Sequence, residues 1–325
     1  MEFLTLLLSG IFFIIYPVIN PDYDAYSVIY STADLGGDWE VFYIYLNHFF
    51  REAGFTYDQF RLFILLFSLS GLWLFLSKLK PALKTKTFFS AYSLIMAISL
   101  AVFVLEYFVI RIRAGLSIGI LMWALYFFNS KELYKHFIGL AFLTLAYFTH
   151  QLTVSILSIF IFIPWLFAAF GKNSKLKNNI YFAIVIFLTM GSLYYLNHTY
   201  ILRGEHLFSQ LNPIRLLALT VIPLGIYFMF TEESKSFPEV PSGLYMFPKL
   251  FTRLYIFFAL GLAIMWLLGL TNESGEAIVR VFTLFSIPAI IALRLKGLFF
   301  NAKIPSFILL SNSLFFIHAL LGGSS

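Results

Sequence analysis

The sequence predicts an all-α, polytopic integral membrane protein, and two observations indicate this fold class. Apolar residues make up 60% of the 325 residues and charged residues only 12%, which is far from the composition of a soluble domain. The apolar runs are continuous and of helix length, whereas the strands of a membrane barrel alternate over about ten residues. The chain has no cysteine, which excludes a disulfide framework and a thiolate metal site.

Apolar windows predict eleven membrane-spanning helices in one domain over residues 1–321, with residues 322–325 interpreted as an added tail. The first run has no basic segment before it and no small-residue cleavage site. We therefore interpret it as a retained helix rather than a signal peptide. The predicted spans are 3–19, 59–77, 88–109, 113–129, 136–150, 152–170, 179–197, 215–231, 250–270, 278–293 and 304–321.

The lysines predict the orientation of these spans. All thirteen fall in alternate connections, and the other connections contain none. By the positive-inside rule, the lysine-bearing connections and the amino terminus are cytoplasmic, and the carboxyl terminus is outside. These connections are 78–87, 130–135, 171–178, 232–249 and 294–303.

The arginines show the opposite distribution, because seven of nine lie on the outer side or at outer helix ends. Membrane orientation does not explain this distribution. The guanidinium group of arginine does explain it, because this planar fork of donors binds oxyanions. The alternative is pairing with outer acids, which we expect for Arg51, Arg61 and Arg203. Arg111 and Arg113 have one local acid, Glu106. A charge near the bilayer core costs roughly 2.5–3.5 kcal/mol, so this cluster predicts the mouth of a site.

The first outer connection, 20–58, contains a segment that predicts an amphipathic helix in the headgroup layer, at 38–54. Its aromatic density is typical of the membrane interface. Trp39, Phe42, Leu46, Phe49 and Ala53 form one face, whereas Glu40, Asn47 and Arg51 fall on another. We expect this second face to be largely solvated except at Glu40, which starts the helix nearest to Asp22 and Asp24.

Asp22 and Asp24 flank Tyr23 at the start of the same connection. Such a pair can hold a divalent cation, but an Asn-Pro-Asp turn in which Asp22 caps the next segment explains it as well. We favour the turn and predict no metal, with one of these acids facing the site. His150 lies at the outer end of its helix, at the depth of Arg111, so a structural and a functional role are about equally expected.

Three of the seven arginines predicted on the outer side lie late in the chain. Arg203 belongs to a loop at 198–215 that could cover a substrate. Arg215 follows Asn212-Pro213 at a helix start, where the helix dipole favours phosphate. Arg280 lies about one turn into an apolar segment, so it is expected to point into the bundle.

Several of these motifs resemble the EpsG branch of the Wzy-type polysaccharide polymerases, in order along nearly the whole chain. The chain departs from that pattern at Thr149, which separates Phe148 from His150, and at Leu152, where a serine is expected. The resembling segments are Asp22-Tyr23-Asp24-Ala25-Tyr26, Glu40 to Asn47, Arg111 with Ala114 and Gly115, Phe148 to His150, and Arg280 with Phe285 and Pro288.

The resemblance implies an enzyme that joins oligosaccharide repeat units on the outer face of the bacterial inner membrane, with a GT-C-like bundle as one option. Donor and acceptor would be carried on undecaprenyl diphosphate, with a chain-length regulator as a further partner and no nucleic acid. Candidate diphosphate ligands are Arg111, Arg113, Arg280 and Arg215, which need no metal or other cofactor. Candidate general bases are His150, Glu40, Asp22 and Asp24, and candidate substrate-binding residues are Tyr23, Tyr26, Glu106 and Arg203.

Alternative functions stay open at this point. A metal-dependent glycosyltransferase that uses a polyprenyl-phosphate sugar would employ Asp22 and Asp24 as ligands. A ligase that transfers finished polymer has nearly the same requirements. A flippase or transporter would need polar groups at several depths, whereas the charges within the predicted helices gather at the outer ends.

Overall fold

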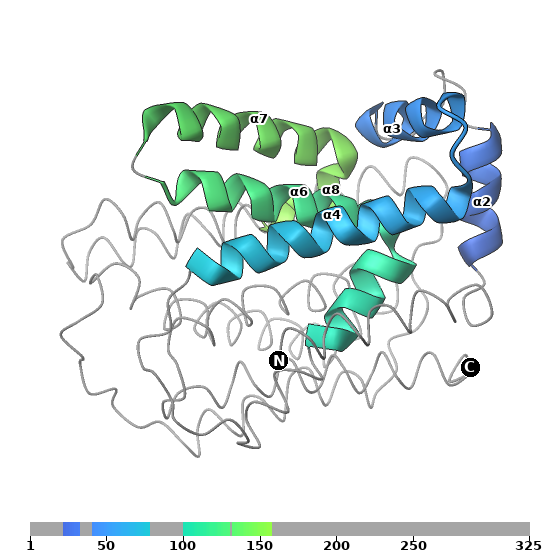
Figure 1. Ribbon diagram of the computed structural model, residues 1–325, viewed down its shortest axis with the longest axis horizontal. Coiled ribbons are helices and arrows are strands. Elements are labelled where there is room, and N and C mark those ends of the chain that lie inside the picture. Colours follow the sequence, from blue (N-terminus) through green and yellow to red (C-terminus); the bar gives the residue numbers. More distant parts are fainter. Residues whose placement is uncertain (1–21, 33–40, 79–99, 131, 158–325) are drawn as a thin grey trace, which may run out of the picture. The chain divides into compact units, whose positions relative to one another are not determined.

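The computed structural model describes residues 22–32, 41–78, 100–130 and 132–157, and these are helical with no strand among them. Those up to Ser155 belong to one compact unit. In chain order the elements are α2 (Asp22–Thr32), α3 (Val41–Glu52), α4 (Tyr57–Lys78), the π-helix η1 (Val104–Ile110), α6 (Ile112–Phe128), α7 (Leu133–Thr149) and α8 (Gln151–Leu157) (Figure 1).

Three of the predicted spans are confirmed as helices, because α4, α6 and α7 match 59–77, 113–129 and 136–150 within three residues. Of the described helices, α4 is long and apolar enough to cross a membrane. The segments Leu100–Ile110 and Ile112–Phe128 pass the same test together, with a bend of 117° between them. The remaining predicted spans lie wholly or partly outside the described residues.

Two capping motifs in succession form the connection between α3 and α4. Gly54 has a φ of 81°, and the amides of Gly54 and Phe55 donate to the carbonyls of Arg51 (2.9 Å) and Phe50 (3.0 Å). This is the Schellman pattern, in which glycine adopts the left-handed conformation at low cost. The Thr56 amide then donates to Gln59 Oε1 at 2.8 Å, and the Gln59 amide donates to Thr56 Oγ1 at 3.3 Å. This capping box starts α4.

Helices α4 and α6 run parallel and approach closely through small residues. A Cβ atom added to Gly119 would lie 2.6 Å from Ser68 Cα, and one added to Gly71 would lie 2.7 Å from the Gly119 carbonyl oxygen. The Ser68 hydroxyl donates to the Gly115 carbonyl at 3.3 Å. Gly115 and Gly119 therefore form a Gly-xxx-Gly contact of the type that lets membrane helices pack backbone to backbone.

Helices α6 and α7 run antiparallel, connected by residues 129–132 (Figure 1). Phe142 of α7 stacks on Trp123 and Phe127 of α6, with ring centroids 6.1 and 5.5 Å apart. Near the start of α7, Gly139 lies against the Ala124 carbonyl and the Phe128 ring. Because α4 and α6 are parallel and α7 is antiparallel, the starts of α4 and α6 and the end of α7 lie at one end of the bundle.

Helices α2 and α3 cover that same end and contact the first turns of α4 (Figure 1). Helix α2 is not among the elements expected from the sequence. Helix α3 confirms the helix expected at 38–54, but the expected solvation of Asn47 is wrong. Asn47 is fully buried, and its Nδ2 donates to the Tyr43 carbonyl at 2.7 Å. Phe49, by contrast, is 65% exposed.

Candidate functional site

The sharp bend between η1 and α6 places Arg111 between two helix ends. The Arg111 amide donates to the Glu106 carbonyl, five residues back, at 2.9 Å, which is the π-helical spacing. The Gly115 amide then donates to the Arg111 carbonyl at 2.8 Å. A Cβ atom on Gly115 would lie only 1.8 Å from the Tyr107 carbonyl oxygen, so the bend requires glycine at this position.

Glu106 and Arg111 form an ion pair that reaches from the interior to the surface. Arg111 Nη1 lies 3.6 Å from Glu106 Oε1, and the side chains are 41% and 5% exposed, respectively. A buried carboxylate needs a partner of opposite charge, and Arg111 supplies one. The guanidinium has five donors and a solvent-accessible side, so an additional anion can approach it. Arg113, two residues on, is half-buried.

A second ion pair lies in the first turns of α4 and accepts a hydrogen bond from α2. Arg61 Nη1 lies 2.9 Å from Asp58 Oδ1, which confirms the expected pairing of this arginine with an acid. The Tyr23 hydroxyl donates to the same Asp58 oxygen at 3.1 Å. Burial raises the pKa of the Tyr23 phenol, and the hydrogen bond to Asp58 raises that pKa further. Tyr23 therefore remains a neutral donor well above neutral pH.

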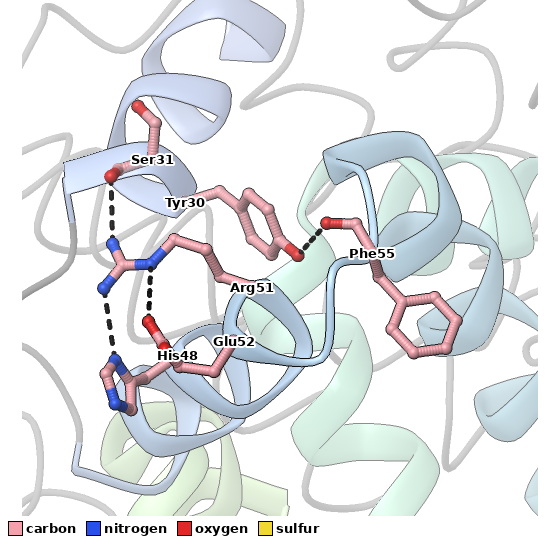
Figure 2. Close-up of polar contacts among 6 residues, drawn as sticks. All are labelled: Tyr30, Ser31, His48, Arg51, Glu52 and Phe55. Atoms are coloured by element: carbon pink, nitrogen blue, oxygen red, sulfur yellow. Dashed lines mark hydrogen bonds and ion pairs between the residues drawn. The ribbon is translucent and has the colours of Figure 1, made fainter.

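Arg51 connects the other end of α2 to α3, as Figure 2 shows. Its Nη1 donates to the Ser31 carbonyl at 2.9 Å, in the last turn of α2, where a cation also complements the helix dipole. Its Nη2 lies 3.1 Å from His48 Nδ1. Since a guanidinium can only donate, that ring nitrogen accepts and carries no proton. The expected pairing of Arg51 with an acid is a long contact of 3.9 Å to Glu52.

His150 lies at the junction between α7 and α8 in an extended conformation, with φ −161° and ψ 92°. This confirms the predicted break between the spans 136–150 and 152–170. The Thr153 amide is 3.4 Å from His150 Nδ1, so the imidazole accepts from the third residue of α8 as an N-cap side chain does. In the neutral ring the proton then lies on Nε2. Part of the role of His150 is structural.

Several predicted site residues lie at one end of the bundle, and the others lie outside the described residues. Arg111 and Arg113 start α6, His150 follows α7, and α2 begins at Asp22. On α2, Asp24 is exposed and Tyr26 is half-buried. Within the described ranges, no three histidine, aspartate or glutamate side chains are grouped as metal ligands. Glu40, Arg203, Arg215 and Arg280 lie outside the described residues.

Sequence reasoning missed the role of Asp58 and Arg61 as the polar contact between α2 and α4. Their spacing of three residues at a helix start was a usable signal, because such residues face each other on a helix. The participation of Tyr23 had no comparable signal, since 35 residues separate it from Asp58.

Comparison with known families shows where this chain belongs. The family model described as the EpsG family matches residues 2–322. Searches of curated proteins and of solved structures gave no match. The match covers nearly all of the sequence and agrees with the order of the short motifs noted above, so the chain is a member of the EpsG family.

Proposed function

We propose that this protein is a Wzy-type polymerase that joins undecaprenyl-diphosphate-linked oligosaccharide repeat units. Membership of the EpsG family supports a polysaccharide polymerase-like function, and family and apolar helices together suggest a membrane protein. The observation that carries the finer proposal is the position of Arg111. Its partly exposed guanidinium stands at a break between two buried apolar helical segments, at the end of the bundle that α2 and α3 cover.

The proposed reaction transfers a growing glycan from its lipid carrier to a new repeat unit. A hydroxyl of the acceptor sugar attacks the anomeric carbon of the donor. The new carbon–oxygen bond forms as the bond between that carbon and the diphosphate oxygen breaks. The hydroxyl proton passes to a general base, and negative charge develops on the departing undecaprenyl diphosphate.

Arg111 is the described residue best suited to stabilise that leaving group. A guanidinium binds phosphate oxygens in pairs and holds its charge at any relevant pH. Glu106 fixes one nitrogen of the fork from the buried side. The diphosphate site is proposed to be completed by Arg113, two residues further along the chain, and by Arg215 and Arg280, with Arg203 on the loop over it.

The general base is proposed among His150, Asp22, Asp24 and Glu40. Asp24 is exposed on the first turn of α2 and can be reached by substrate. His150 uses Nδ1 to accept from the Thr153 amide, so this ring would need to exchange that contact to accept a substrate proton. Tyr23 and Tyr26 are proposed to bind sugar. In the proposed orientation this end of the bundle faces the outside of the bacterial inner membrane, with the amino terminus cytoplasmic.

Analysis of lipid-linked glycans in a deletion strain tests the function. Accumulation of single repeat units on undecaprenyl diphosphate is the expected result, whereas accumulation of long lipid-linked polymer would mean a ligase. Complementation with Arg111→Ala is expected to lower polymer formation by about 10²–10³-fold, the usual effect of removing one donor to a developing anion. Wild-type polymer from Arg111→Ala and Arg280→Ala would disprove the diphosphate site.

A further inference from the structure

We propose that Arg61 is a positioning residue that acts through Asp58 and Tyr23. Together they hold the first turn of α2, which carries Asp22 and Asp24, against the start of α4. The proposal rests on the proposed function, because it assigns this clamp to the acids of that site. The clamp is defined here as Tyr23, Asp58 and Arg61.

The burial of Arg61 is the first observation behind this proposal. Its side chain is 1% exposed and is among the largest fully buried side chains of the described residues. Burying a guanidinium is costly unless charge and hydrogen bonds compensate for the lost water. Asp58 supplies the charge at 2.9 Å and is itself 58% exposed. The rings of Tyr23 and Tyr57 lie 5.0 and 5.8 Å from Arg61 Cζ, within the range of cation–π contacts.

The contact of Tyr23 with this pair is the second observation. The Tyr23 hydroxyl and the Arg61 guanidinium donate to the same carboxylate oxygen, Oδ1 of Asp58. Tyr23 thus makes a hydrogen bond through its hydroxyl and a cation–π contact through its ring. Asp22 and Asp24 are its neighbours on either side in the chain. Fixing the Tyr23 side chain therefore fixes the backbone from which both candidate acids project.

The other end of α2 is held separately. The Tyr30 hydroxyl donates to the Phe55 carbonyl at 2.7 Å, and Arg51 donates to the Ser31 carbonyl (Figure 2). The Tyr30 ring also stacks on Phe60 at 5.3 Å. These contacts keep α2 attached when the clamp is removed. Loss of the clamp is therefore expected to free the first turn of α2 without unfolding the helix bundle.

Two conservative variants separate positioning from folding. Tyr23→Phe keeps the ring over Arg61 and removes only the hydroxyl. Asp58→Asn keeps the shape but leaves the buried guanidinium without its counter-charge, so its unfolding midpoint is measured beside the rate. We expect each to lower kcat at least about tenfold, because a displacement of about 1 Å at a catalytic group can cost 10²-fold. Asp58→Asn changes no residue assigned to the substrate, so we expect it to leave KM unchanged. The double variant should be no worse than the more affected single variant, since both changes break the same contact.

Matched controls are present in the chain. Tyr45→Phe removes a hydroxyl from a tyrosine that is 56% exposed on α3. Glu132→Gln breaks another acid–base pair with the same spacing and distance, Glu132 with Lys135 at 2.9 Å, at the opposite end of the bundle. Both are expected to retain wild-type kcat and KM.

Spin-label distance measurements test the clamp without any assay of activity. The native chain has no cysteine, so Ala25→Cys on α2 and Ser77→Cys near the end of α4 can be labelled cleanly in the full-length protein. The stretch of α4 from Asp58 to Ser77 spans about 28 Å at 1.5 Å per residue. We expect a narrow distance distribution in the parent, a broader one with Tyr23→Phe or Asp58→Asn, and no change with the two controls.

The outcomes are distinguishable. Unchanged distributions in both clamp variants would overturn the proposal, and so would broadening without loss of kcat. Loss of rate without broadening would overturn it too, because Tyr23 would then act on substrate directly. If the wild-type protein has no polymerase activity, the proposed function fails, and the distance measurements alone still decide whether the clamp holds α2.

Discussion

Replacement of Gly115 by alanine tests the bend that positions Arg111. The added Cβ atom would lie 1.8 Å from the Tyr107 carbonyl oxygen, 2.6 Å from its carbonyl carbon and 3.0 Å from Phe108 Cα. Non-bonded carbon atoms are most stable at about 3.5–4.0 Å. All three neighbours are backbone atoms, so no side-chain rotation relieves the overlap, and η1 must move away from α6.

The expected cost follows from these contacts. Overpacking a well-packed interior costs about 1–3 kcal/mol when neighbours can adjust, and rigid backbone neighbours place Gly115→Ala at the upper end or beyond. The higher helix propensity of alanine offsets about 1 kcal/mol of this destabilisation. A net loss of at least about 2 kcal/mol remains, together with displacement of Arg111.

Gly139→Ala is the matched control. A Cβ atom there would lie 3.2 Å from the Ala124 carbonyl oxygen and from two carbons of the Phe128 ring. A shift of the ring relieves two of these contacts, and a helix displacement of a few tenths of an ångström relieves the third. Unfolding midpoints in detergent and polymer formation in the deletion strain are the two assays. We expect both to fall for Gly115→Ala and to stay near wild type for Gly139→Ala. Wild-type stability and polymer length in Gly115→Ala would refute the reasoning.

Three further predictions concern the other described elements. Arg111→Lys is expected to fail in polymer formation although its charge is kept, because an ammonium does not replace the fork; full activity would reduce the role of Arg111 to charge alone. A spin label at Phe49→Cys is expected to collide more often with oxygen, which dissolves in lipid, than with a water-soluble nickel complex. A label at Ser31→Cys is expected to collide more often with the nickel complex. Equal collision rates at the two positions would place the exposed face of α3 away from lipid. The pKa of Tyr23 lies above its usual value of 10.0, so its hydrogen bond is intact below about pH 10 and is lost as the pH rises through the raised pKa. The Ala25–Ser77 distance distribution should broaden there in the parent and show no such step in Tyr23→Phe.

The long helices could be predicted from sequence because their apolar runs are continuous. Helices α4, α6 and α7 begin and end within three residues of the predicted limits. The breaks before α6 and after α7 could also be predicted, since charges at 111–113 and polar residues at 149–151 are unfavourable inside an apolar helix. The seven-residue π-helix η1 could not be predicted from the sequence, because its composition is that of any apolar helix.

The connection at 20–58 was predicted less well, for reasons that concern particular residues. Helix α2 has little separation of apolar and polar positions, and its stability comes from contacts with α4 such as Tyr30 with Phe60. Helix α3 was found by its spacing, but periodicity assigns polar residues to water. Asn47 instead lies inside, because its amide hydrogen-bonds the backbone one turn earlier.

Arg61 and Arg111 represent two kinds of arginine that sequence alone could not separate. Arg61 and Arg111 each lie close to one acid, and both occur at a helix start. The structure distinguishes them by which partner is buried: at Arg61 the cation is inside and Asp58 faces out, whereas at Arg111 the acid Glu106 is inside and the cation faces out. An anionic substrate can approach only the second arrangement. Arg61 is therefore suited to hold protein segments together, and Arg111 is suited to bind a diphosphate.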